Sequence, residues 1–290
     1  MKYTFIIALL FLGSRALPQE KSEIINTRIS LENKKMNMLW IDNIHGEIEV
    51  NGYDGSEIIL EVKKDIKARN QEELDRLWEK ISLKVENTGD TVEVFIGGTC
   101  AYECKDECEC GRRRSHYCCC CNSKDDFEFN FDFSIKVPYS TNLILSTINK
   151  GNIVVNQVSG AHKINNVNGG IRMDGISGPA EVHTINGDVY VKYLKTPDSN
   201  SRYYTLNGNL NIYFPNNLSA DMSFKSFNGE YFTDFTITES LKPTLVTREE
   251  KGASTIYKID EKTAVRVGNG GVNLDFETFN GNIYIRKNSN

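Results

Sequence analysis

The sequence lacks the features that mark most enzymes and nucleic-acid-binding proteins. Its 290 residues contain no Gly-x-Ser-x-Gly, His-Glu-x-x-His or Walker-type motif, and the four histidines are scattered. The net charge is −5, and the one basic run, at 112–114, is only three arginines long. A nucleic-acid-binding surface needs clustered lysine and arginine. The sequence therefore predicts a protein that is not an enzyme, needs no cofactor and does not bind nucleic acid.

Long apolar segments are also missing after the N-terminus, and a membrane-spanning helix needs about 20 such residues. The N-terminus itself has the layout of a secretory signal. Lys2 is followed by an apolar stretch over 5–12, and Ser14 and Ala16 are the small residues that a signal peptidase recognises. A buried N-terminal helix is the alternative. We expect removal of residues 1–16 and export to the periplasm, the cell surface or the medium, with no transmembrane segment.

Cysteine is absent outside one insertion at 98–126. An even number of clustered cysteines in an exported protein predicts disulfides. Pairing between the two arms of the insertion is favoured, because adjacent cysteines pair only through strained geometry. The candidates are Cys100, Cys104, Cys108, Cys110, Cys118, Cys119, Cys120 and Cys121.

Two alternatives for this insertion stay open. A metal site for Zn²⁺ or Cu⁺ would use thiolates and one imidazole, from Cys108, Cys110, His116 and Cys118, although the paired Cys-x2-Cys frame is missing. A reactive thiol is the other alternative, because the charges of 112–114 would lower its pKa.

Residues 20–97 predict an N-terminal β region with one short helix at 70–81. Asn70 and Glu73 have the spacing of a capping box at the start of that helix. We expect its apolar face to pack on a sheet edge. The face consists of Leu74, Leu77, Trp78 and Ile81.

Strand signals flank the helix and the cysteine insertion. Asn51-Gly52 follows an alternating segment and predicts a turn. Residues 127–137 alternate strictly, so that one face of the predicted strand is apolar. This face consists of Phe127, Phe129, Phe131, Phe133, Ile135 and Val137.

A phrase of the form Thr/Ser-apolar-Asn-Gly recurs through the second half of the chain. Asn149, Asn168, Asn186, Asn207 and Asn228 follow one another at intervals of 18 to 21 residues. A row of hairpins would place turn signals every 8–12 residues or so. The spacing instead predicts an all-β fold in which 127–290 forms a parallel β-solenoid, or β-roll, of coils of about 20 residues. Each phrase is expected to stack above the last.

The phrase chemistry suits corners of such coils. Glycine tolerates the positive φ of a tight corner, and stacked asparagines can hydrogen-bond as a ladder. The expected corners are Gly151, Gly169, Gly187, Gly208, Gly229 and Gly281. The apolar pairs that follow should point into the core, namely Ile153 and Val155, Ile171 and Met173, Val189 and Val191, Leu210 and Ile212, and Ile283 and Ile285.

These motifs resemble the "putative adhesin" family, a domain of unknown function in exported β-strand-repeat proteins of Bacteroidetes-type bacteria. The resemblance covers roughly 40–290 and rests on Val137-Pro138, the Gly151 corner, the serial Asn-Gly phrases, Phe214-Pro215, Gly268 to Gly271 and the closing segment 278–285. It implies a right-handed β-solenoid or β-roll, export and an adhesive role. It supplies no catalytic residues, and the cysteine insertion departs from its pattern.

Carboxylates and histidines offer weak catalytic candidates. A carbohydrate-active β-solenoid enzyme would use clustered carboxylates, and Asp174 and Asp188 are the nearest ones. A calcium site at 186–188 lacks the acidic repeat spacing of calcium-binding rolls. His162 and His183 fall in successive coils and could meet in space, but surface positions are the simpler interpretation.

Aromatic residues suggest a binding surface. An exposed stripe along the solenoid would bind sugars or another protein, although half of the rings could instead cover the edges of the core. The stripe would consist of Tyr190, Tyr193, Tyr203, Tyr204 and Tyr213.

The sequence thus favours a noncatalytic exported β-repeat protein. It would act as an adhesin-like or cell-envelope scaffold or binding module, whose ligand is a surface, a glycan or a protein. The alternatives are a carbohydrate-active β-solenoid enzyme and an envelope signalling accessory that binds a membrane partner through 70–81 or the cysteines.

Overall fold

A computed structural model describes residues 18–31, 37–98, 127–241, 246–251, 254–259 and 262–288. The predicted signal sequence and all eight cysteines with His116 lie outside the described residues. Within the described part of the chain, no helix has the length and apolar character needed to cross a membrane.

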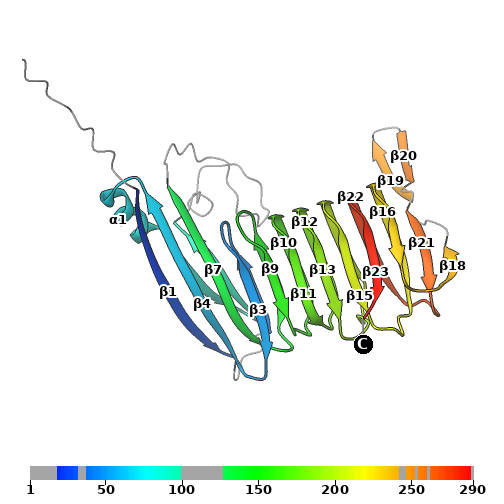
Figure 1. Cartoon of the computed structure of the whole chain (residues 1–290), viewed down its shortest axis with the longest axis horizontal. Coiled ribbons are helices and arrows are strands. Elements are labelled where there is room, and N and C mark those ends of the chain that lie inside the picture. Colours follow the sequence, from blue (N-terminus) through cyan, green and yellow to red (C-terminus); the bar gives the residue numbers. More distant parts are fainter. Residues whose placement is uncertain are drawn as a thin grey trace, which may run out of the picture.

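The chain forms two large mixed β-sheets that lie one in front of the other (Figure 1). Sheet A has ten strands in the order β1 (Gln19–Ser30), β4 (Glu57–Ala68), β7 (Glu128–Pro138), β3 (Ile48–Tyr53), β9 (Ile153–Asn156), β11 (Ile171–Ile176), β13 (Val189–Tyr193), β15 (Leu210–Phe214), β23 (Ile283–Lys287) and β17 (Tyr231–Thr233). The sequence predicts an all-β fold with one short helix, and the structure confirms a mostly β chain.

Sheet B has eleven strands. Their order is β18 (Ile237–Leu241), β21 (Thr263–Val267), β16 (Ala220–Asn228), β22 (Val272–Asn280), β14 (Ser201–Asn207), β12 (Ala180–Asn186), β10 (His162–Asn168), β8 (Asn142–Thr147), β2 (Met38–Asp42), β6 (Thr91–Gly97) and β5 (Ser82–Thr88). A separate two-stranded sheet pairs β19 (Val246–Lys251) with β20 (Ser254–Ile259).

Strand direction differs between the middle and the ends of the two sheets. From β8 to β15 the chain alternates between the sheets, and each strand pairs in parallel with the strand two places along the sequence. Antiparallel pairs occur toward the ends, where β1, β4 and β7 adjoin, where β5 meets β6, and where β21 lies between β16 and β18. Strands from 20–97 and from 127–290 occur in both sheets, and the division into domains stays a prediction.

The core fills the space between the sheets and follows the period-2 pattern of the strands. The apolar pairs predicted after each Asn-Gly phrase are all buried, with at most 1% exposure. In β7 the predicted alternation is also confirmed, because Phe131, Phe133, Ile135 and Val137 are buried and Phe127 and Phe129 pack partly against the core.

The helix α1 (Gln71–Lys80) begins where the sequence predicts it. Oδ1 of Asn70 accepts a hydrogen bond from the backbone N–H of Glu73 at 2.9 Å, which caps the first turn. Leu74 and Leu77 are buried, and the helix lies against β1 and β4 at the end of sheet A (Figure 1). The predicted packing on a sheet edge is confirmed.

The turn predicted at Asn51-Gly52 is wrong. Both residues continue β3 and pair with Lys136 and Val137 of β7. A side chain at Gly52 would overlap the carbonyl oxygen of Gln157. This glycine therefore permits close approach of the neighbouring backbone instead of reversing the chain.

The stacking order also differs from the prediction that each phrase lies above the last. β22 and β23, the last two strands in the sequence, insert between β14/β15 and β16/β17. The C-terminus accordingly lies within the row of strands and not at its end (Figure 1). The segment 236–264, which interrupts the repeat, contributes β18 and the start of β21 to sheet B, and also the separate pair β19–β20.

Candidate functional site

The asparagines of the phrases form one hydrogen-bonded ladder along the molecule. In each bond, Nδ2 of one asparagine donates to Oδ1 of the asparagine on the adjacent strand. Asn168 donates to Asn149, Asn186 to Asn168 and Asn207 to Asn186, each at 2.8 Å, then Asn280 to Asn207 at 2.7 Å and Asn228 to Asn280 at 2.8 Å. The amide of each asparagine is therefore used by the fold.

A second ladder runs beside the first. The residue two places before each of these asparagines donates its side chain to a glycine carbonyl in the neighbouring phrase, as Thr184 does to Gly169 at 2.9 Å and Thr205 does to Gly187 at 2.9 Å. Both threonines are fully buried. Thr147, Asn166, Ser226 and Thr278 make the equivalent bond at 3.0 to 3.1 Å.

Glycine is required in the phrases for a different reason from the one expected. Of the six predicted corners, only Gly208 and Gly281 have positive φ, of 158° and 153°. At each of the six positions a Cβ atom would overlap the carbonyl oxygen of a glycine in the adjacent phrase. Close backbone packing, and not a left-handed corner, excludes a side chain at these positions.

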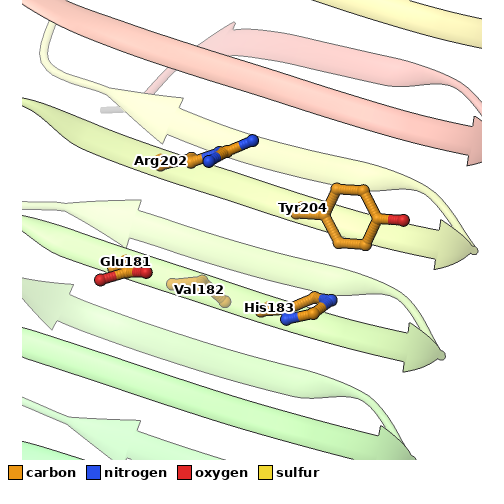
Figure 2. Close-up of a pocket in the computed structure, with 5 residues that line it drawn as sticks. All are labelled: Glu181, Val182, His183, Arg202 and Tyr204. Carbon is orange, nitrogen blue, oxygen red and sulfur yellow. The ribbon is translucent and has the colours of Figure 1, made fainter. Parts of the chain in front are cut away.

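The side chains of the phrases make hydrogen bonds and close contacts within the fold. The side chains that could bind a ligand are therefore those on the outer faces of the two sheets. A shallow hollow of about 240 Å³ lies on the outer face of sheet B between β12 and β14 (Figure 2). The period of 2 along each strand turns alternate side chains outward. The lining residues are Glu181, Val182 and His183 from β12 and Arg202 and Tyr204 from β14.

Two aromatic rings form one side of the hollow. The rings of His183 and Tyr204 meet edge to face, with centroids 4.6 Å apart. Partial burial lowers the pKa of His183, the charge of Arg202 lowers it further, and Glu181 offsets part of the shift. The imidazole is therefore biased toward its neutral form, which can donate and accept a hydrogen bond.

Ion pairs fix the charged side of the hollow. Arg202 reaches Asp275 at 3.5 Å and Glu277 at 3.4 Å, both on β22. Glu181 pairs with Lys163 on β10 at 3.5 Å. All three pairs cross adjacent strands, and Glu181–Lys163 and Arg202–Asp275 join register partners, so the pairs hold the rim of the hollow in place.

This arrangement suits binding better than glycoside hydrolysis. Glycoside hydrolysis uses two carboxylates on opposite sides of the bond that is cleaved, and Glu181 is the one carboxylate among the lining residues. Within the part of the chain that the structure describes, no group of three His, Cys, Asp or Glu side chains could hold a metal ion. The hollow offers a guanidinium, a carboxylate, an imidazole and a phenol, which together recognise polar ligands.

The histidines and aspartates that the sequence suggested as catalytic candidates lie apart in the structure. His162 points into the core of sheet B and is 3% exposed, whereas His183 points outward, so the two histidines do not meet. Asp174 pairs with Arg172 at 3.2 Å on sheet A. Asp188 accepts a hydrogen bond from the backbone N–H of Asn209 at 2.7 Å. The two aspartates therefore have separate structural roles.

The five tyrosines do not form one stripe. Tyr193 and Tyr203 are fully buried, and their hydroxyl oxygens lie 2.6 Å apart. Tyr190 and Tyr213 lie on the outer face of sheet A, and Tyr204 lies on sheet B. No sequence motif marks Glu181 and Arg202. Only the register between β12 and β14 brings these two residues together, because 21 residues separate them in the chain.

No family model matches the chain, and no curated protein matches it. Among solved structures, a "putative cell adhesion protein" from Clostridium sporogenes is 10% identical, with 94% of this chain and 100% of that one covered and a TM-score of 0.35. A "putative adhesin" from Bacteroides fragilis is 8% identical and a "putative lipid binding protein" from Parabacteroides distasonis 10% identical. Each covers 92% of this chain and 97% of its own at a TM-score of 0.28. Two of these three solved structures are described as a cell adhesion protein or an adhesin.

Proposed function

We propose that the chain is an exported, noncatalytic binding protein with an adhesin-like or cell-envelope scaffold role. It would hold a ligand on the outer face of sheet B, in the hollow between β12 and β14. The lining by Glu181, His183, Arg202 and Tyr204 carries this proposal, because four different polar groups converge there on one open face.

The proposed architecture beneath this surface is a β-solenoid. The alternation of the chain between the two sheets supports it, as does the parallel register of equivalent strands from β8 to β15. The asparagine ladder and the glycine contacts link each repeat to its neighbours. A stack joined in this way holds its outer side chains at fixed spacings, which reduces the entropy lost on binding.

The ligand class that fits the hollow is a glycan or a polar protein segment. Arg202 can donate hydrogen bonds to carboxylate or hydroxyl oxygens, and the edge-to-face pair of His183 and Tyr204 offers an apolar surface beside it. The hollow is open, so it suits part of a larger ligand that extends over the sheet.

A glycan array, with peptide ligands spotted beside the glycans, tests the proposal on the exported chain. We expect saturable binding of one ligand class that falls at least tenfold in Arg202→Gln and in Tyr204→Ala. Arg28→Gln is the matched control, because Arg28 is an exposed arginine on β1 that pairs with Glu57 at 3.8 Å. Equal binding by all three variants, or conversion of the bound ligand to a product, would contradict the proposal.

A further inference from the structure

We propose a second binding site, for an acidic polysaccharide, on the outer face of sheet A. The site is a band of two guanidinium groups and four aromatic rings that crosses β11, β13, β15, β23 and β17. We call it the aromatic–arginine stripe, and it consists of Arg172, Tyr190, Tyr213, Arg286, Tyr284 and Phe232. It lies on the other sheet from the hollow and does not depend on it.

The first half of the stripe spans β11 to β15. The guanidinium of Arg172 lies over the ring of Tyr190, 4.1 Å from its centroid. The ring of Tyr190 in turn leans toward Tyr213, with centroids 5.2 Å apart and planes tilted by 41°. Such contacts between cations and ring faces are favourable and hold the guanidinium plane in place.

The second half continues the stripe to the edge of sheet A. Arg286 lies over the ring of Tyr284 at 5.0 Å, and Tyr284 stacks on Phe232 with centroids 5.1 Å apart and planes within 10°. Tyr213 and Arg286 are register partners on adjacent strands, which joins the two halves. Five strands about 4.8 Å apart give a stripe about 20 Å long, enough for several sugar units.

Core packing does not account for these rings. The inward-facing residues of the same strands, such as Val191, Ile212 and Ile285, are completely buried and fill the core. The stripe residues take the alternate, outward positions, and Phe232 is 46% exposed. Contiguous aromatic rings on an outer face mark an interaction surface more often than single exposed rings do.

The charge of this face selects an anionic ligand. Asp174 neutralises Arg172 at 3.2 Å, whereas Arg286 and Lys192 have no ion pair within the described residues. This local positive charge on a chain of net charge −5 is complementary to carboxylates. A stacked guanidinium also keeps its edge free for paired hydrogen bonds to a carboxylate.

A polysaccharide of uronic acids matches both features. The C–H face of a sugar ring packs on an aromatic ring, while its carboxylate reaches a neighbouring guanidinium. Nucleic acid fits the stripe less well, because its closely spaced phosphates need a denser row of cations, and Asp174 lies within the row.

Binding of the mature full chain to polygalacturonate tests this site. Dextran serves as the neutral polymer, and single-stranded DNA and phosphatidylglycerol vesicles serve as other anions. We expect saturable binding to polygalacturonate that weakens with added salt and falls at least tenfold in Arg286→Gln and in Tyr213→Ala. Unchanged melting temperatures would show that these outward substitutions leave the fold intact.

Tyr139→Ala is the matched control, because Tyr139 is an exposed tyrosine outside both the stripe and the hollow, and it should retain polygalacturonate binding. Binding that is absent, that the two stripe variants leave intact, that Tyr139→Ala abolishes equally, or that is no tighter than binding to dextran, DNA or the vesicles would overturn the proposal. The proposed function of the sheet B hollow is tested separately. It fails if Arg202→Gln and Tyr204→Ala do not weaken binding of any ligand on the array, whatever the result with polygalacturonate.

Discussion

Asn280 donates its side-chain amide to the oxygen of Asn207 at 2.7 Å, although 73 residues separate the two in the chain. Asn228, from the preceding phrase in sequence, donates to Asn280 from the other side at 2.8 Å. The last phrase of the chain thus occupies an internal position in the ladder, between the phrases of Asn207 and Asn228. β14 and β16 become connected only when the C-terminal strand β22 lies between them.

Replacing Asn280 by alanine removes both of these bonds. The asparagines are exposed, so each bond contributes toward the lower end of about 0.5–1.5 kcal/mol. We expect Asn280→Ala to lower the free energy of unfolding by about 1–2 kcal/mol in urea denaturation. The exposed turn residue Asn216 provides the control, and equal stability of Asn280→Ala and Asn216→Ala would contradict a stabilising ladder.

Adjacent glycines give a sharp test of the close packing between phrases. A Cβ atom at Gly169 would overlap the carbonyl oxygen of Gly151 and lie 2.8 Å from Nδ2 of Asn166. At Gly170 the nearest atom, the carbonyl oxygen of Asp188, would be 3.2 Å away. We expect Gly169→Ala to cost more than about 3 kcal/mol or to abolish folding.

For Gly170→Ala we expect a change of less than about 1 kcal/mol, because the restricted unfolded chain offsets the tighter contact. Thermal melts of the two variants make the comparison. Similar melting temperatures for both would show that the phrases tolerate a side chain in the stack.

The buried His162 should make the stability depend on pH. Burial lowers the pKa of His162 to about 4 from an ordinary value near 6.5. At pH values between these two, the unfolded chain binds a proton that the folded chain does not. Stability is therefore full above pH 6.5 and falls as the pH drops toward 4, by about 3 kcal/mol at most.

His162→Leu removes this proton and keeps an apolar side chain beside its register partners Leu143 and Ala180. Urea denaturation between pH 7 and 4 should show a smaller loss of stability for the variant than for the wild type. The same pH dependence in both proteins would mean that His162 is not buried in its neutral form.

Tyr203 and Tyr204 are neighbours in sequence with opposite surroundings. The Tyr203 hydroxyl lies 2.6 Å from that of the fully buried Tyr193, and Tyr204 faces the hollow on sheet B. Tyr203→Phe leaves a buried hydroxyl without this partner and should cost about 1–2 kcal/mol. Tyr204→Phe should change stability by less than about 0.5 kcal/mol. Equal effects in denaturation would place both tyrosines in the same environment.

Local patterns predicted the parts of the fold that depend on local chemistry. The alternation in 127–137 and the capping pair Asn70 and Glu73 identify a strand and a helix, because burial and capping act within a few residues. The order of strands escaped prediction. The phrases at 205 and 278 have nearly the same chemistry, so any of them could neighbour any other. In the fold, β16 pairs with β21 on one side and with β22 on the other.

The candidate site was less predictable for a related reason. Tyr193 and Tyr203 look like Tyr190 and Tyr204 in the sequence, yet they point inward because the strand register fixes which residues face the core. Glu181 and Arg202 carry no motif and become neighbours only through the pairing of β12 with β14. Their role therefore depends on a contact between strands that a single sequence does not specify.

We propose that the protein holds a ligand on the outer face of sheet B without changing it chemically. The decisive experiment determines the mass of that ligand after saturable binding to the purified protein, prolonged incubation and release. The account predicts full recovery of the ligand at its original mass, together with weaker retention by Arg202→Gln. A shortened or chemically altered ligand that appears with the wild-type chain and not with Arg202→Gln would contradict the account and identify an enzyme.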